Sequence, residues 1–209
     1  MSTDLPPLVL TGAGVRLEPL AIEHVSALVS AATEDRSAYG FSSVPATPVA
    51  MSAWVQAALA EQAAGGALPF VTHSLAHERI VGSTRFYEIA LWQWPDGDAR
   101  QREDRPDVCE IGYTWLAASE QRTACNTEAK LLMLSHAFDV WEVHRVAFRT
   151  DRRNERSRLA LERIGAQFEG IRRAERPGID GTIRDAAFYS IVAAEWPEVK
   201  ALLTRRLEG

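Results

Sequence analysis

The chain has 209 residues, of which 46% are hydrophobic and 24% charged, a composition typical of one globular domain with a full core. Its net charge of −5 argues against a nucleic-acid-binding protein, which needs a basic surface. No apolar run reaches the roughly 18 residues of a membrane span, and the N-terminus has no secretory pattern. Two cysteines, Cys109 and Cys125, are too few for a disulfide framework or a zinc site. We therefore expect a single cytoplasmic domain over residues 1–209, with no metal, no nucleic-acid partner and no membrane.

Residue patterning predicts strands and helices in the first half of the chain. Period-two alternation predicts strands, helical spacing of apolar residues predicts helices, and Pro48 suits a first helical turn. The expected strands are 15–20, 69–74 and 80–89, and the expected helices are 22–32 and 48–65. A polar stretch, 92–107, is expected to be an exposed, flexible loop. Its Trp92 and Trp94 either line an acceptor pocket or, as is commoner for such residues, anchor the loop to the core.

The second half alternates strands and helices more regularly. The expected strands are 109–116, 143–150, 167–174 and 184–192, and the expected helices are 127–141, 155–164 and a last one from Glu195. Strand–helix–strand–helix–strand–strand order implies an α/β (α+β) fold with a mixed sheet and helices packed on it. We expect about six to seven strands and about four to five helices.

The junction between the strand 109–116 and the next helix is suited to binding phosphate. A loop of small and polar residues ends there at the first turn of a helix, where free N–H groups and the helix dipole attract anions. Arg122 adds positive charge, and Asn126 or Thr127 could cap the helix in the absence of a ligand. The alternative is a well-capped helix after a polar turn, with no ligand at all.

Three motifs in this region resemble those of GNAT acetyltransferases, in the order found there. Gln121, Ala124 and Asn126 occupy the fixed positions of the pyrophosphate signature Gln/Arg-x-x-Gly-x-Gly/Ala. The segment from Thr150 to Ser157 resembles the end of the family's fifth strand and the start of its next helix. The following motifs extend the likeness: Glu110-Ile111-Gly112-Tyr113-Thr114-Trp115, the Asn-Thr-Glu at 126–128 and Arg163-Ile164-Gly165-Ala166. The forms that these motifs take here resemble those of the RimJ/RimL-like branch of the family, and the likeness covers residues 109–191.

The resemblance implies a GNAT fold and a binding site for acetyl-CoA. In this fold the fourth and fifth strands part at one end, and the pantetheine arm lies in the gap and pairs with the fourth strand. The residues implied to meet pantetheine are Tyr113, Thr114, Trp115 and Leu116, with Asn154 bonding its amide and Ser157 near the sulfur. Those implied around the pyrophosphate are Gln121, Arg122, Thr123, Ala124, Cys125, Asn126 and Thr127.

The resemblance also implies an acid and a base for transfer to an amine. The base is Glu110, because related enzymes often use a carboxylate on this strand; the alternative is a salt-bridged strand residue. Many relatives use a tyrosine as the acid at the position of Leu161 here, so Ser157 becomes the candidate acid, with Tyr189 in reserve. Ser157 could equally serve as part of a helix cap.

The acceptor and assembly stay open at this level. The branch resembled here acetylates protein N-terminal amines, and a small-molecule amine such as an antibiotic or polyamine is the alternative. Ala124 replaces a glycine of the signature, so a non-catalytic acyl-CoA-binding sensor is a further alternative. Residues 39–46 and 92–107 are expected to frame the acceptor side, and homodimers are common in this branch.

Overall fold

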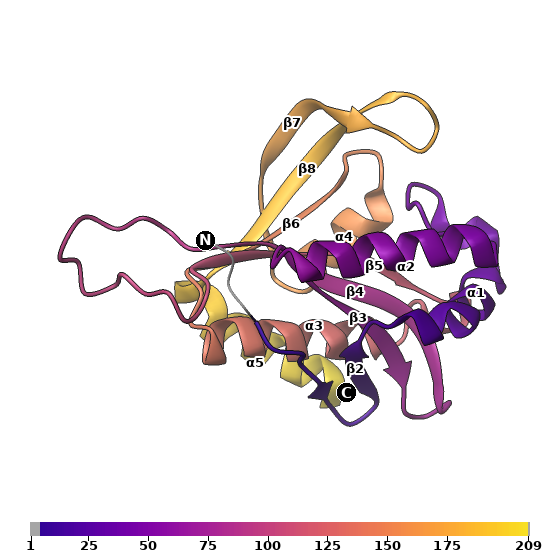
Figure 1. The fold of residues 1–209 in the computed structure, drawn as a ribbon, viewed down its shortest axis with the longest axis horizontal. Helices are drawn as coiled ribbons and strands as arrows, with labels where there is room; N and C mark the ends of the chain where they lie inside the picture. The colour runs from indigo at the N-terminus through magenta and orange to yellow at the C-terminus, as the bar shows by residue number, and fades with distance from the viewer. Residues whose placement is uncertain (1–4, 209) are drawn as a thin grey trace.

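The computed structural model describes residues 5–208, which form an eight-stranded mixed sheet with helices on both faces (Figure 1). The strand order is β1-β2-β3-β4-β5-β6-β8-β7, and every neighbouring pair is antiparallel except β5 and β6. The strands are β1 (Leu10–Thr11), β2 (Val15–Pro19), β3 (Ala67–Ser74), β4 (Arg79–Ala90), β5 (Val108–Leu116), β6 (Arg145–Asp151), β7 (Gln167–Pro177) and β8 (Ile183–Val192). The expected mixed α+β architecture is confirmed.

Five α-helices within residues 5–208 cover the sheet. They are α1 (Val25–Thr33), α2 (Pro48–Ala63), α3 (Cys125–Ser135), α4 (Glu155–Arg163) and α5 (Trp196–Glu208). Successive side chains of a strand point to opposite faces. On β4, Arg85 reaches Glu61 of α2, whereas the adjacent Thr84 lies 3.6 Å from the sulfur of Met133 on α3. Helix α2 therefore packs on one face and α3 on the other.

Two details differ from the sequence-based expectation. The sheet has an eighth strand, because Leu10 and Thr11 pair with β2. Two residues are too few to show an alternation. Helix α3 begins at Cys125 rather than Thr127, and its C-terminal end continues as a π-helical turn, His136–Val140. The caps proposed at Asn126 and Thr127 are therefore wrong, because both residues lie inside the first turn.

Strands β5 and β6 part soon after they meet. Their parallel pairing consists of Val108 with Arg145, Cys109 with Val146, and Glu110 with Ala147. Beyond Glu110, β5 stays paired with β4 on its other side as far as Leu116, while β6 follows β8. These are the strands counted fourth and fifth from the sequence, so the expected splay is confirmed. The β6-facing edge of β5 from Ile111 onward has no partner strand among the described residues.

A β-bulge interrupts β5 within this unpaired stretch. Ser83 pairs with Trp115 and Arg85 pairs with Gly112, so Tyr113 and Thr114 together oppose the single residue Thr84. Tyr113 has a φ of 51°, in the left-handed region that non-glycine residues rarely adopt. Bulges bend a strand and re-aim its side chains, and they are common beside active sites.

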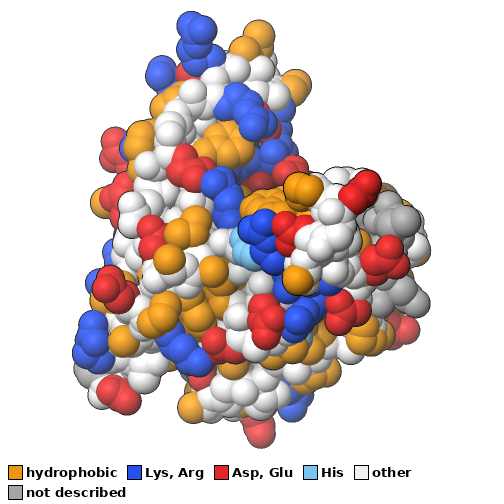
Figure 2. Space-filling view, turned by 90° about the vertical axis from the view of Figure 1, so that its left-hand side faces the viewer, with side chains coloured by type: hydrophobic (Ala, Val, Ile, Leu, Met, Phe, Trp, Pro, Cys, Tyr) orange, Lys and Arg blue, Asp and Glu red, His pale blue; other side chains and the backbone are white. Residues whose placement is uncertain are grey.

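The β7–β8 hairpin projects at the top of Figure 1, and the 92–107 loop projects at the left. On the face drawn in Figure 2, basic and acidic side chains are interspersed among hydrophobic ones. None of the helices in the described part of the chain is long and apolar enough to cross a bilayer.

Candidate cofactor and acceptor site

The loop between β5 and α3 places free backbone N–H groups at the start of the helix. Thr123 Oγ1 accepts a hydrogen bond from the Cys125 N–H at 3.1 Å, so Thr123 caps the turn. The N–H groups of Asn126 and Thr127 have no acceptor within residues 5–208, and no side chain caps α3 at Ala124. Free donors at the positive end of a helix dipole form an anion site.

The alanine in place of the signature's glycine does not strain this loop. Ala124 has φ −66° and ψ −19°, which any residue adopts. The left-handed residue is instead Arg122, with φ 65°. An arginine in this conformation costs roughly 1–2 kcal/mol. The conformational objection to Ala124 therefore does not apply in this structure.

Gln121 ties the loop to its surroundings through its side chain. Its Nε2 donates to the Leu116 carbonyl at 3.0 Å, and its Oε1 accepts from Arg156 Nη1 at 3.1 Å. Arg156 also donates to the Ala38 carbonyl at 2.9 Å. The Leu116 carbonyl further accepts from the Tyr39 hydroxyl at 3.2 Å. Gln121 and Leu116 therefore fix the end of β5, and the carbonyl of Leu116 is already engaged within the protein.

On the other margin of the gap, α4 follows β6. The Asn154 Oδ1 accepts from the Ser157 N–H at 3.1 Å, which makes Asn154 the N-cap of α4. The amide nitrogen of Asn154 and the hydroxyl of Ser157 make no hydrogen bond with the described residues. Asn154 can therefore cap the helix and still donate to a ligand, and the Ser157 hydroxyl is available for a proton transfer.

Glu110 lies at the last paired position before β5 and β6 part, buried to 3% exposure. Across the strand pair, Tyr87 of β4 faces it and donates a short hydrogen bond from its hydroxyl to the carboxylate. Arg149 of β6 approaches the same carboxylate at 3.2 Å through its Nε and donates to the Tyr87 hydroxyl at 3.2 Å. Gly112 makes room for this arrangement, because a Cβ there would lie 2.7 Å from the Tyr87 ring.

Burial raises the pKa of Glu110 to about 7, although the Tyr87 hydrogen bond and the Arg149 charge act in the opposite direction. Burial, followed by the neighbouring charge of Glu110, raises the pKa of Tyr87 above its ordinary value. A carboxylate that changes protonation near neutral pH has the strength required of a general base.

The same sheet face carries an aromatic and basic cluster that includes the bulge. The Arg85 guanidinium lies 3.8 Å from the centre of the Tyr113 ring and 5.2 Å from that of Trp54. Its Nη1 pairs with Glu61 Oε2 at 2.7 Å, and Tyr113 meets the Tyr87 ring edge-on at 5.2 Å. Tyr113, which is 43% exposed, thus packs between Arg85 and Tyr87 on the sheet face that also carries Glu110.

Sequence reasoning proposed Glu110 as a site residue but did not identify the neighbours that the structure gives it, Tyr87 and Arg149, or the nearby Arg85. The alternation in 80–89 predicted a strand and offered no way to choose which of its residues would face Glu110. Only the register between β4 and β5 identifies Tyr87 as the partner.

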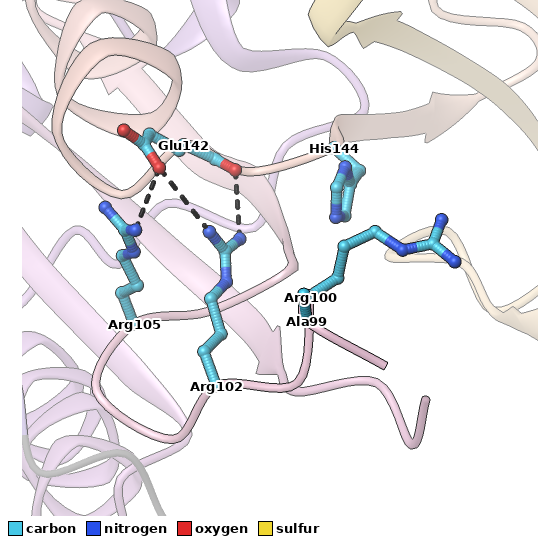
Figure 3. A pocket seen from close by; sticks show the side chains of 6 residues that line it. All are labelled: Ala99, Arg100, Arg102, Arg105, Glu142 and His144. Carbon is cyan, nitrogen blue, oxygen red and sulfur yellow. Dashed lines mark hydrogen bonds and ion pairs between the residues drawn. The ribbon is translucent and has the colours of Figure 1, made fainter. Parts of the chain in front are cut away.

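A hollow of about 390 Å³ lies between the 92–107 loop and the segment before β6 (Figure 3). Its three arginines each have an acidic neighbour: Arg100 pairs with Asp98, Arg102 with Asp107, and Arg105 with Glu142. Because these charges are already neutralised, the hollow is a poor anion site.

Trp92 and Trp94 belong to the same region as this hollow. Their rings lie 5.1 Å and 5.6 Å from that of His144, which precedes β6. The Trp92 N–H also donates to the buried Asp107 carboxylate at 2.8 Å. This packing favours the role of anchoring the loop over that of lining an acceptor pocket.

The residues at the parted strands fit coenzyme A. The unpaired edge of β5 offers peptide groups to an extended arm, as in recognition by strand addition. The N-terminus of α3 offers free donors to a pyrophosphate at the end of that edge. In the part of the chain that is described, no group of three or more His, Cys, Asp or Glu residues could hold a metal ion.

Comparisons with known proteins agree with this geometry. Residues 15–167 match the family described as "Acetyltransferase (GNAT) domain". A stretch of 87 residues is 36% identical to "Putative ribosomal N-acetyltransferase YdaF" of Bacillus subtilis (strain 168) and covers 42% of this chain and 46% of that protein. The matched stretch thus spans about half the length of this curated relative.

Two solved structures resemble the whole fold. A GCN5-related N-acetyltransferase from Brucella melitensis is 27% identical, with a TM-score of 0.79 over 97% of this chain and 86% of that one. RimJ of Mycobacterium smegmatis, solved in complex with CoA-disulfide, is 22% identical, with a TM-score of 0.77 over 99% and 97%. The matched family covers most of the chain, and the chain therefore belongs to the GNAT family of acetyltransferases.

Proposed function

We propose that this protein transfers an acetyl group from acetyl-CoA to a primary amine. The observation that carries the proposal is the buried Glu110 at the point where β5 and β6 part. In this proposal the extended arm of the cofactor lies in the gap, and a carboxylate with a pKa of about 7 lies at the closed end of the gap. Acetyl-CoA supplies the activated acyl group as a thioester.

Two sets of residues hold the cofactor in this proposal. The pyrophosphate lies against the backbone N–H groups of Asn126 and Thr127, with the charge of Arg122 nearby. The pantetheine arm pairs with the unpaired edge of β5 between Tyr113 and Leu116. Asn154 donates its amide N–H to the arm from the opposite margin.

Glu110 acts as the base that makes the amine nucleophilic. The amine arrives protonated at neutral pH, and Glu110 accepts its proton directly or through one water. The nitrogen then forms a bond to the thioester carbonyl carbon, and the carbon–sulfur bond breaks. Ser157, whose hydroxyl has no partner among the described residues, donates its proton to the leaving thiolate and takes up the second proton that the attacking nitrogen releases.

We further propose a protein N-terminal amine as the acceptor. The support is the matched stretch of YdaF, a relative named for ribosomal acetylation, and the Asn-Thr-Glu variant at 126–128. The residues Arg85, Tyr113 and Glu110 do not by themselves distinguish a protein N-terminus from a small molecule. A small-molecule amine is therefore the alternative acceptor that the experiment must test. The homodimer stays a prediction. Analytical ultracentrifugation tests it, because the mass of the particle in solution distinguishes a dimer from a monomer.

Calorimetric titration with acetyl-CoA tests the cofactor site first. The wild type should bind saturably, and the double variant Arg122→Ala, Asn126→Ala should bind more weakly, with Glu142→Gln as a remote control. A panel of N-terminal peptides and small amines then identifies the acceptor. Saturable binding without acetylation of any amine would indicate an acyl-CoA sensor, and absence of binding at millimolar acetyl-CoA would rule out the proposed site.

A further inference from the structure

Lys130 of α3 is a buried lysine without an acidic partner. Its residue exposure is 4%, and within residues 5–208 no carboxylate lies at ion-pair distance from its Nζ. The Nζ donates instead to Thr114 Oγ1 at 2.7 Å and to Thr84 Oγ1 at 3.2 Å. Burial lowers the pKa of Lys130 to about 7. Burying an amine among neutral groups is costly, so its position calls for an explanation.

The two threonines that bind Lys130 are the residues facing each other at the β5 bulge. Thr114 is one of the two bulged residues, and Thr84 is the single residue opposite them. Their hydroxyls lie 2.8 Å apart. The amine thus ties the bulged segment to β4 from below, on the face opposite Glu110.

The bulge needs such a restraint because its conformation is unfavourable. Tyr113 has a positive φ, which is unfavourable in a non-glycine residue and persists only where the surroundings enforce it. The ladder hydrogen bonds are also interrupted there, and the edge toward β6 has no partner strand.

Helix α3 connects this restraint to the phosphate loop. Lys130 lies five residues after Cys125, so about 7.5 Å of helix separates its Cα from the helix start. One rigid element therefore carries both the free N–H groups at its N-terminus and the amine that holds the bulge.

We propose that Lys130 is a positioning residue that holds the β5 bulge in register with the phosphate loop, so that the peptide groups from Tyr113 to Trp115 meet the cofactor's thioester. The inference rests on the proposed function, because only a bound acyl-CoA gives those peptide groups a partner. Lys130 itself touches neither the cofactor nor the acceptor.

The test compares Lys130→Met with Leu134→Ala. Methionine is close to lysine in length and shape but lacks the amine, whereas Leu134→Ala removes a buried α3 side chain and leaves the hydrogen bonds from Lys130 to both threonines in place. The first readout is amide hydrogen exchange by NMR in the free protein. At residues 113–115, measured relative to β3 amides, exchange should accelerate about tenfold or more in Lys130→Met and stay near wild type in Leu134→Ala.

The second readout is calorimetric affinity. Lys130→Met should weaken acetyl-CoA binding about fivefold or more, while 3′,5′-ADP, which carries only the nucleotide part, should bind within about twofold of wild type. Unchanged exchange at residues 113–115 would overturn the proposal, and so would equal acceleration in both variants.

A second pair of variants covers the case in which Lys130→Met does not fold. Thr84→Val removes one acceptor of the amine at nearly constant volume, and Thr84→Ser retains the hydroxyl. Faster bulge exchange in the valine variant, restored in the serine variant, supports the restraint, and equal exchange in both contradicts it. These exchange measurements need no acceptor, so a failure to find an acetylated amine would count against the proposed function alone.

Discussion

Tyr87 and Glu110 face each other across β4 and β5, with the phenol donating its hydrogen bond to the buried carboxylate. The pair lies where β5 leaves β6, so the carboxylate is within the sheet but beside the gap that β6 no longer fills. Burial favours the protonated acid, whereas the phenol and Arg149 favour the carboxylate. The balance of these effects sets the pH range in which Glu110 can accept a proton.

Glu110→Gln should lower kcat by about 100-fold or more, because general bases typically contribute factors of 10² to 10⁴. In the wild type, kcat/KM should increase with pH through about 7, since the carboxylate form is the active base and is lost as pH falls below that value. Glutamine cannot titrate, so this rising limb should disappear. Steady-state rates between pH 5.5 and 8.5 measure it, and a limb that persists in the variant would assign the base elsewhere.

Tyr87→Phe should move the rising limb to higher pH by about half a unit to one unit. The phenol stabilises the charged carboxylate, so its loss favours the protonated acid and raises the pKa of Glu110. At pH 7 the rate should therefore fall about twofold to fivefold, and much of it should return at pH 8.5. A uniform loss across pH would instead indicate that Tyr87 acts on the substrate.

Ala124→Gly, which restores the glycine of the signature, should change acetyl-CoA affinity by less than about threefold. Ala124 already has a right-handed helical conformation, so glycine relieves no strain there. Calorimetry measures the effect. Arg122→Gly serves for comparison, because it relieves the unfavourable left-handed backbone conformation of Arg122 and also removes a positive charge. Tightening of tenfold or more at Ala124→Gly would show that the methyl group obstructs the phosphate.

Asn154→Ala and Asn154→Asp should separate the two roles of this side chain. Alanine removes the N-cap of α4 and should cost about 1 kcal/mol of unfolding free energy, whereas aspartate retains the cap. Both lack the amide donor, so both should weaken acetyl-CoA binding. Thermal unfolding and calorimetry provide the two measurements, and wild-type affinity in the aspartate variant would leave Asn154 with the structural role alone.

The sequence by itself determined the order of the elements, because hydrophobic periodicity and turn residues are local signals. It also predicted a phosphate-binding loop, which stays a prediction, since Gln121 to Thr127 are contiguous and the N–H groups of a helix start need no distant partner. Glu110 was proposed as the base through a motif that is likewise contiguous. The two-residue strand β1 escaped prediction because its existence depends on pairing with β2 alone.

Only the tertiary structure decided which side chains act together. Tyr87 meets Glu110 because of the register between β4 and β5, in which residues more than twenty positions apart in sequence pair. The bulge whose Thr114 accepts a hydrogen bond from Lys130 is a property of the same register. Arg122, and not Ala124, has the left-handed backbone conformation, and this depends on the path of the loop between β5 and the start of α3. Burial likewise comes from packing, so the shifts in pKa at Glu110 and Lys130 depend on neighbours that no local sequence pattern contains.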